Sequence, residues 1–306
     1  MTTRSNKVLA ALSAEFQPLS KVIAIANQKG GVGKTSSAFN FAHYLNELGY
    51  KVLVCDLDGQ GNMTELFFEQ DVLKNFVHTS AVELFEDEMT EFDFLKHPSG
   101  VDLVATTRNC HELTNVDTKS IESVSTFYKN LTLAAAQYDF VVIDTPPAPG
   151  VRTTAACASA NYIFAPVLVD TFAMPALEGV VNSVYNIGQL IEEDLKIHGI
   201  LINQLQEGSA ETREDLEMLI SAIGDALIPT PVRLSKPFRR AQRSGIPVWH
   251  LRHSGSEQKT SRETRKAYGE MASRIEEIPQ FRIDHFNDFS RAVRAKIAVQ
   301  IESNQG

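Results

Sequence analysis

The chain has 306 residues, of which 43% are hydrophobic and 22% charged, enough for one α/β domain with additions. It has no run of about 18 apolar residues, and residues 1–20 contain no continuous apolar stretch, which argues against a spanning helix and a signal peptide. The net charge of −9 disfavours bulk attraction to nucleic acid, so any such binding must come from a local basic surface.

Residues 1–20 predict a short N-terminal helix, and from Lys21 short apolar runs alternate with helical stretches. Strands are expected at Val22–Ala26, Val52–Cys55, Val101–Ala105, Phe140–Ile143, Tyr162–Val169 and Gly199–Ile202. Helices are expected at Ser36–Leu48, Ser120–Gln137, Ala176–Leu195, Ala210–Ile223, Lys259–Glu277 and Phe281–Ser303. This alternation predicts a doubly wound α/β fold, a mostly parallel sheet flanked by helices, that binds ligands at the carboxyl ends of its strands. We assign residues 21–255 to that domain and residues 256–306 to C-terminal helices packed on it.

A glycine-rich turn follows the first strand and leads directly into a helix. Backbone N–H groups and the helix dipole converge there, which suits a phosphate group. The glycines let the backbone fold closely around the phosphates. The Lys34 ammonium can reach the β- and γ-phosphates, and the Thr35 hydroxyl can ligate Mg²⁺. The predicted ATP-binding segment comprises Lys29, Gly30, Gly31, Val32, Gly33, Lys34, Thr35 and Ser36.

Two later strands end in aspartates, as expected for a nucleotidase. Asp144 follows one apolar strand, and Asp56 and Asp58 follow another. An acidic residue at such a strand end, beside the phosphate turn, holds Mg²⁺ through water. The sequence therefore predicts a Mg²⁺ site at Thr35, Asp56 and Asp144. Asp58 is predicted to orient the attacking water, which makes it a catalytic residue together with Lys29 and Lys34.

At these residues the sequence resembles the ParA/MinD group of deviant Walker A ATPases, and within it the ParA partition ATPases. The matching segments are KGGVGKT, DLDGQGN, VVIDTPP and IPTPVRLSKPFRRAQRSGIPVW. Gly59 stands where the family usually has proline. The resemblance implies a homodimer that sandwiches two ATP molecules, with Lys29 crossing to the partner's phosphates. It also implies that Asn203 hydrogen-bonds the adenine and that the loop from Pro229 to Val232 packs on it.

A basic segment without Asp or Glu lies between Pro231 and Trp249 and contains Arg233, Lys236, Arg239, Arg240 and Arg243. These side chains suit contacts to DNA phosphates without base reading. The alternative is a solvated face, or arginines that line the nucleotide pocket. The resemblance favours DNA, since ATP dimers of this family bind DNA without sequence preference.

The resemblance also implies a ParB-like adaptor, a role in plasmid or chromosome partition, and a cytoplasmic, nucleoid-associated location. The alternative is a MinD-like ATPase that positions a protein cargo or binds a membrane surface. The C-terminal segment carries a stripe of Ile283, Phe286, Phe289, Val293 and Ile297 at helical spacing. Packing on the ATPase domain explains the same stripe, so membrane binding is not expected.

Overall fold

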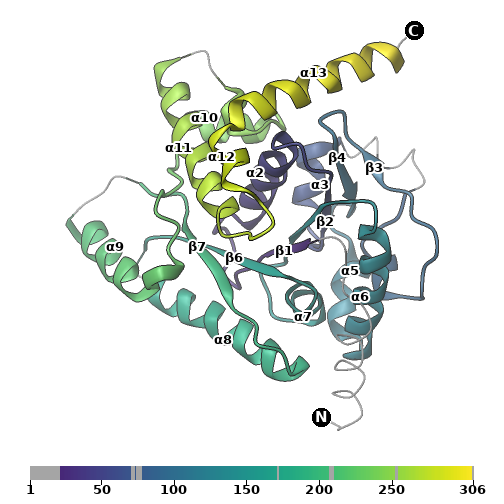
Figure 1. The fold of residues 1–306 in the computed structure, drawn as a ribbon. Coiled ribbons are helices and arrows are strands. Elements are labelled where there is room, and N and C mark those ends of the chain that lie inside the picture. The colour runs from purple at the N-terminus through teal and green to yellow at the C-terminus, as the bar shows by residue number, and fades with distance from the viewer. Residues whose placement is uncertain are drawn as a thin grey trace.

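The computed structural model describes residues 21–69, 73, 78–170, 172–206, 210–251 and 254–304. The helix expected over residues 1–20 lies outside them. One sheet contains seven strands in the order β3-β4-β2-β5-β1-β6-β7 (Figure 1). The strands are β1 (Lys21–Ile25), β2 (Val52–Asp56), β3 (Leu95–Lys96), β4 (Val101–Val104), β5 (Phe140–Asp144), β6 (Tyr162–Val167) and β7 (Ile197–Ile202). Pairing is parallel throughout, except that β3 runs antiparallel to β4.

Helices connect and cover these strands. They are α2 (Lys34–Glu47), α3 (Asn62–Phe67), α5 (His111–Asn115), α6 (Glu122–Ala135), α7 (Val151–Ala158), α8 (Ala173–Ile191), α9 (Ala210–Ile223), α10 (Lys236–Arg243), α11 (Gly255–Ala272), α12 (Gln280–Asp284) and α13 (Phe286–Asn304). Single 3₁₀ turns are η1 (Glu83–Phe85), η2 (Val116–Thr118), η3 (Gly224–Ala226) and η4 (Val248–His250). The doubly wound, mostly parallel fold is confirmed. The two-residue edge strand β3 was not expected, and the last expected helix is divided between α12 and α13.

The sheet is covered on both faces, which explains why its strands read as continuous apolar runs. Helices α2, α11 and α13 lie on one face, and α6, α7 and α8 lie on the other (Figure 1). The core of the first face is aromatic, with Trp249 and Tyr268 both fully buried. Helix α2 is therefore enclosed on nearly every side, and the turn before it is held against a rigid scaffold.

The C-terminal helix α13 packs on α2 through a buried carboxylate. Glu47 of α2 accepts hydrogen bonds from Trp249 Nε1 at 3.1 Å and Arg294 at 2.8 Å, and also from Ser290. Burial alone would raise the pKa of Glu47, but His250, Ser290 and Arg294 lower it to about 2. Phe286 stacks on Tyr44 with ring centroids 4.5 Å apart. Part of the apolar stripe thus packs on the domain, and no helix in the described part of the chain is long and apolar enough to cross a membrane.

Candidate nucleotide-binding site

The glycine-rich turn lies between β1 and α2, at the carboxyl edge of the sheet. Gly31 and Gly33 have φ of 75° and 88°, in the left-handed region that favours glycine. A Cβ on Gly33 would lie 2.1 Å from the Asn203 amide nitrogen. That amide is 1% exposed and donates to the Val32 carbonyl at 2.8 Å. Asn203, at the end of β7, therefore holds the turn, and its contact with adenine stays a prediction.

Lys34 is the first residue of α2 and is 6% exposed. Its Nζ donates to the Lys29 carbonyl oxygen at 3.3 Å. Burial lowers the pKa of Lys34, while the charges of Asp144 and Asp58 act in the opposite direction. The ammonium is thus held between the turn and two carboxylates, a place that suits a cation serving the β- and γ-phosphates.

Asp56 and Asp144 end neighbouring strands, are paired in register and are fully buried. Burial raises the pKa of Asp144 well above its usual value, and Asp56 adds to this, whereas Thr35 lowers it. Neither Asp144 carboxylate oxygen has a hydrogen bond of good geometry within the described residues. Buried carboxylate oxygens beside a hydroxyl fit Mg²⁺ and its waters. The described residues include no group of three or more His, Cys, Asp or Glu suited to a metal ion.

Asp56 also organises the loop that follows β2. Its Oδ2 accepts the Thr64 amide at 2.9 Å and the Thr64 hydroxyl at 2.7 Å, and its Oδ1 accepts the Asp58 amide at 3.2 Å. Burial raises the pKa of Asp56 to about 7 although the Thr64 bonds lower it. These bonds engage the same oxygens that a metal would use, so the metal role of Asp56 stays a prediction.

Lys29, expected to reach a partner's phosphates, is bound within its own chain. Its Nζ forms an ion pair with Asp170 at 2.5 Å and lies 5.9 Å from the centre of the Phe172 ring. The Lys29 amide donates to Asn27 Oδ1 at 2.8 Å, which fixes the backbone at the start of the turn. Sequence reasoning missed Asp170, and its place after the strand β6 is the signal that it overlooked.

A cavity of about 760 Å³ opens above the turn. Its described lining includes Gly30, Gly31, Gly33, Lys34, Thr35, Ser36 and Asp58. The opposite wall comes from Leu234, Phe238, Arg239, Gln242 and Arg243. The volume suits a nucleotide, with the phosphates over the turn. Pro229 and Val232, which were expected to pack on the adenine, are not among the described lining residues, and their role stays a prediction.

Comparison with known proteins decides the family. A family model described as an AAA domain matches residues 20–197. The chromosome-partitioning ATPase Soj of Thermus thermophilus is 32% identical over 220 residues, covering 70% of this chain and 83% of Soj. The cell division protein PomZ of Myxococcus xanthus is 30% identical, covering 73% of this chain and 70% of PomZ. The chain belongs to the ParA/Soj family of P-loop ATPases.

Solved structures agree on the fold of this ParA/Soj-family ATPase. Apo McdA of Cyanthece superposes with a TM-score of 0.69 at 19% identity, covering 82% of this chain and 99% of McdA. A plasmid partition protein of Borrelia burgdorferi bound to AMPPNP superposes with a TM-score of 0.67 at 22% identity, covering 84% of this chain and all of that protein.

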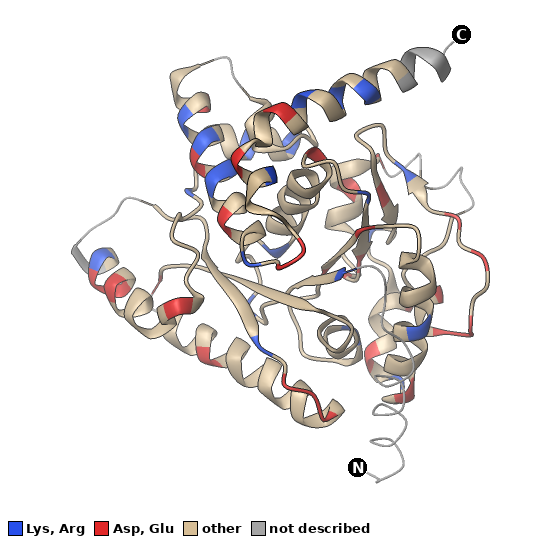
Figure 2. Cartoon of the chain, in the orientation of Figure 1, with Lys and Arg blue, Asp and Glu red and all other residues tan. Residues whose placement is uncertain are grey.

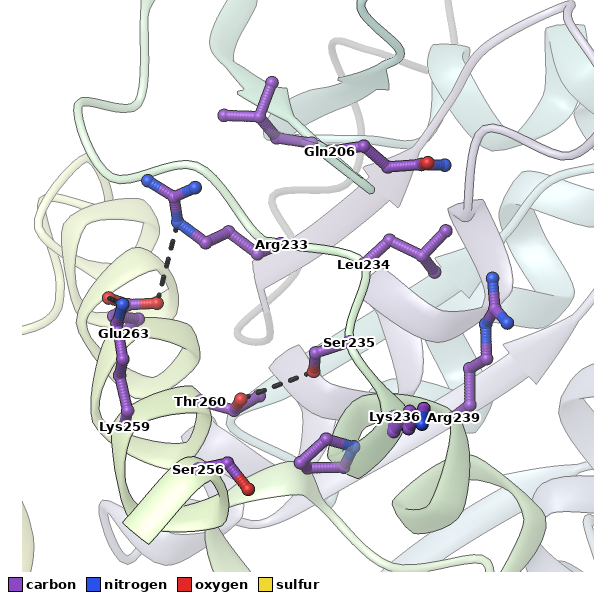
Figure 3. A pocket seen from close by; sticks show the side chains of 12 residues that line it. Gln206, Arg233, Leu234, Ser235, Lys236, Arg239, Ser256, Lys259, Thr260 and Glu263 are labelled. Atoms are coloured by element: carbon purple, nitrogen blue, oxygen red, sulfur yellow. Dashed lines mark hydrogen bonds and ion pairs between the residues drawn. The ribbon is translucent and has the colours of Figure 1, made fainter. Parts of the chain in front are cut away.

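The five basic residues of the segment between Pro231 and Trp249 separate into three groups. Arg239 and Arg243 line the nucleotide cavity, as described above. Arg240 forms an ion pair with the buried Glu257 of α11. Arg233 and Lys236 line a second cavity of about 570 Å³ between α10 and α11, which Arg239 also borders (Figure 3). The five side chains thus have different surroundings, and their contact with DNA stays a prediction.

The second cavity has mixed charge. Figure 3 shows Arg233 turned toward Glu263 of α11, with 3.8 Å between Arg233 Nε and Glu263 Oε2. Lys259 and Lys236 add positive charge to its rim. Lys and Arg also gather on α11 and along α13, whereas Asp and Glu dominate the loop before β3 (Figure 2). The charge of this acidic protein is thus distributed unevenly.

Proposed function

We propose that this ATPase forms an ATP-dependent dimer that binds DNA without sequence preference and drives plasmid or chromosome partition with a ParB-like adaptor in the cytoplasm, at the nucleoid. The single observation that carries the proposal is the nucleotide cavity beside the second cavity, whose lining includes Arg233, Lys236 and Lys259, in a chain of the ParA/Soj family. Relatives named as chromosome-partitioning ATPases support the biological role.

In this proposal Lys29 couples ATP binding to dimerisation. In one chain this cation pairs with Asp170, whose carboxylate is about one-third exposed. An ATP γ-phosphate from a second copy offers more negative charge and several acceptor oxygens, so it would draw Lys29 away from Asp170. Hydrolysis removes that phosphate and lets the ion pair form again. ATP thereby favours the closed dimer, and its hydrolysis favours separation.

DNA would be held at the groove between α10 and α11. Arg233, Lys236 and Lys259 border it and would contact phosphates of the backbone. At physiological salt the Debye length is about 8 Å, so the overall negative charge is largely screened while direct contacts are not. A dimer presents two such grooves on one body, which raises the affinity over that of one chain.

DNA retention at low salt, measured with ATP and with ADP, tests this proposal. The double change Arg233→Ala with Lys236→Ala should weaken retention and keep ATP binding and dimerisation. It should also lower the salt slope by about 0.9 for each DNA phosphate that is no longer bound. Lys129→Ala is the matched control, because Lys129 is an exposed cation on α6 that pairs with Glu88. Full retention by the double variant would assign DNA binding to another surface.

The second candidate is an ATPase that positions a protein cargo or binds a membrane surface, as MinD-like proteins do. The relative PomZ, named a cell division protein, favours a positioning role. The same experiment separates the two functions. Wild-type protein that shows no DNA retention with ATP even at low salt would favour the second candidate.

A further inference from the structure

A buried ion pair contacts the two loops that carry Asp58 and Asp144. Arg152, in the first turn of α7, is 4% exposed. Its Nε and NH2 groups donate to Asp117 Oδ2 at 3.1 and 2.6 Å. Its NH1 group donates to the Leu57 carbonyl at 3.0 Å. One planar guanidinium therefore binds the carboxylate of η2 and the backbone between Asp56 and Asp58 at the same time.

Asp117 extends this connection to the second loop. Its Oδ1 accepts the backbone amide of Arg152 at 3.1 Å, near the start of α7. Helix α7 follows the loop that begins at Asp144, and a Cβ on Gly150 would lie 2.5 Å from the Asp117 carboxylate. The carboxylate thus fixes the far end of the Asp144 loop, while Arg152 fixes the Asp58 loop.

The loop that carries Asp58 has a second contact, with Cys110 and the helix α5 that follows it. The Cys110 amide donates to the Gly59 carbonyl at 2.8 Å. A Cβ on Gly59 would lie 2.5 Å from the Thr114 hydroxyl oxygen, so α5 approaches the loop closely at the position where the family usually has proline. The segment from α5 to η2 is therefore a support for this loop.

We propose that Arg152 and Asp117 are positioning residues for ATP hydrolysis, which fix Asp58 relative to Asp144. The inference rests on the proposed role of Asp58 as the group that orients the attacking water. Neither residue of the pair is among the described residues that line the nucleotide cavity, and both would act through Asp58 rather than on ATP itself. A buried ion pair adds little net stability but specifies geometry, and hydrolysis is sensitive to misplacement of the groups that orient water.

Two conservative variants test the pair. Arg152→Lys keeps the charge, but one ammonium cannot reproduce the fork that reaches both Asp117 and Leu57. Asp117→Asn keeps the shape and removes the charge. In both, kcat should fall about tenfold or more while the affinity for an ATP analogue changes less than about twofold. Glu277→Gln is the matched control, since Glu277 binds Tyr162 and Lys21 at the opposite end of the sheet.

A double-mutant cycle with Asp58→Ala decides whether the pair acts through Asp58. In the Asp58→Ala protein, Arg152→Lys should lower the residual rate by less than about twofold, because the group it positions is already gone. A full additional decrease would overturn the inference, and so would wild-type kcat in folded Arg152→Lys and Asp117→Asn. Loss of folding in both variants would also overturn it, because the pair would then serve stability alone. Wild-type turnover by Asp58→Ala would refute the proposed role of Asp58 first and this inference with it.

Discussion

Acid should destabilise this protein through a histidine in the helix that carries the phosphate turn. His43 of α2 is 3% exposed, and its ring centre lies 4.5 Å from that of Phe39 and 5.4 Å from that of Phe67. Its Nε2 has no hydrogen-bond partner among the described residues. Burial lowers the pKa of His43 to about 3, although the charge of Glu47 opposes this.

The sign and size of this change in stability follow from the pKa of His43 in the folded and in the unfolded protein. The unfolded chain protonates His43 below about pH 6.5, whereas the folded protein keeps it neutral down to about pH 3. Between those values the unfolded state binds more protons, so the free energy of unfolding falls as the pH falls. From neutral pH to about pH 4.5 the decrease is about 3 kcal/mol. That is a large part of the roughly 5–15 kcal/mol by which domains are stable.

Urea unfolding at neutral pH and at about pH 4.5 measures this decrease, with circular dichroism as the signal. The free energy of unfolding of His43→Leu should fall by about 3 kcal/mol less than that of the wild type between the two pH values, because its side chain cannot titrate. Comparing pH values within each protein cancels the packing cost of the substitution. His285→Gln, which changes an exposed histidine, is the control and should follow the wild type. Equal decreases in His43→Leu and wild type would refute the reasoning.

Three further predictions concern the ATP cycle. Lys34→Ala should abolish binding of a labelled ATP analogue, because it removes the main side-chain cation of the phosphate site, and unchanged affinity would contradict that assignment. Lys29→Ala should bind ATP as a monomer yet fail to dimerise in light scattering. Asp170→Asn should instead strengthen ATP-driven dimerisation a few-fold, since the partly exposed pair that it breaks is worth at most about 1 kcal/mol. A weaker dimer in Asp170→Asn would show that the carboxylate serves the interface itself.

The sequence predicted most of the fold because its signals are local. Each parallel strand appears in the sequence as an apolar run of a few residues. The turn from Gly30 to Gly33 follows such a run and precedes a helix, and that succession indicates a phosphate-binding turn. The position of Asp144 at a strand end could be predicted from the apolar run before it, and its role as a metal ligand stays a prediction. Strand β3 was missed because two residues on a sheet edge carry no periodic pattern.

What could not be predicted depends on contacts between distant segments. Asn203 meets the phosphate turn only after β7 and β1 are placed in one sheet with β6 between them. Asp170 pairs with Lys29 across 141 positions of sequence, and Asp117 meets Arg152 across 35. A single sequence gives the side-chain chemistry of each partner but no measure of its distance from the other.

In the basic segment, the helical spacing of the arginines could have predicted which of them share a face. Ser235 caps α10 by accepting the Phe238 amide at 3.2 Å, so the arginines that follow lie on a regular helix. Arg239 and Arg243 are four residues apart and therefore share one face, which is the face that borders the nucleotide cavity. Arg240 is turned about 100° from Arg239 and meets Glu257 of α11 instead. Helical spacing thus separates Arg239 and Arg243, which line the nucleotide cavity, from Arg240, which meets α11. The groove where we propose that DNA binds is lined by Arg233, Lys236 and Lys259, and Arg239 also borders it.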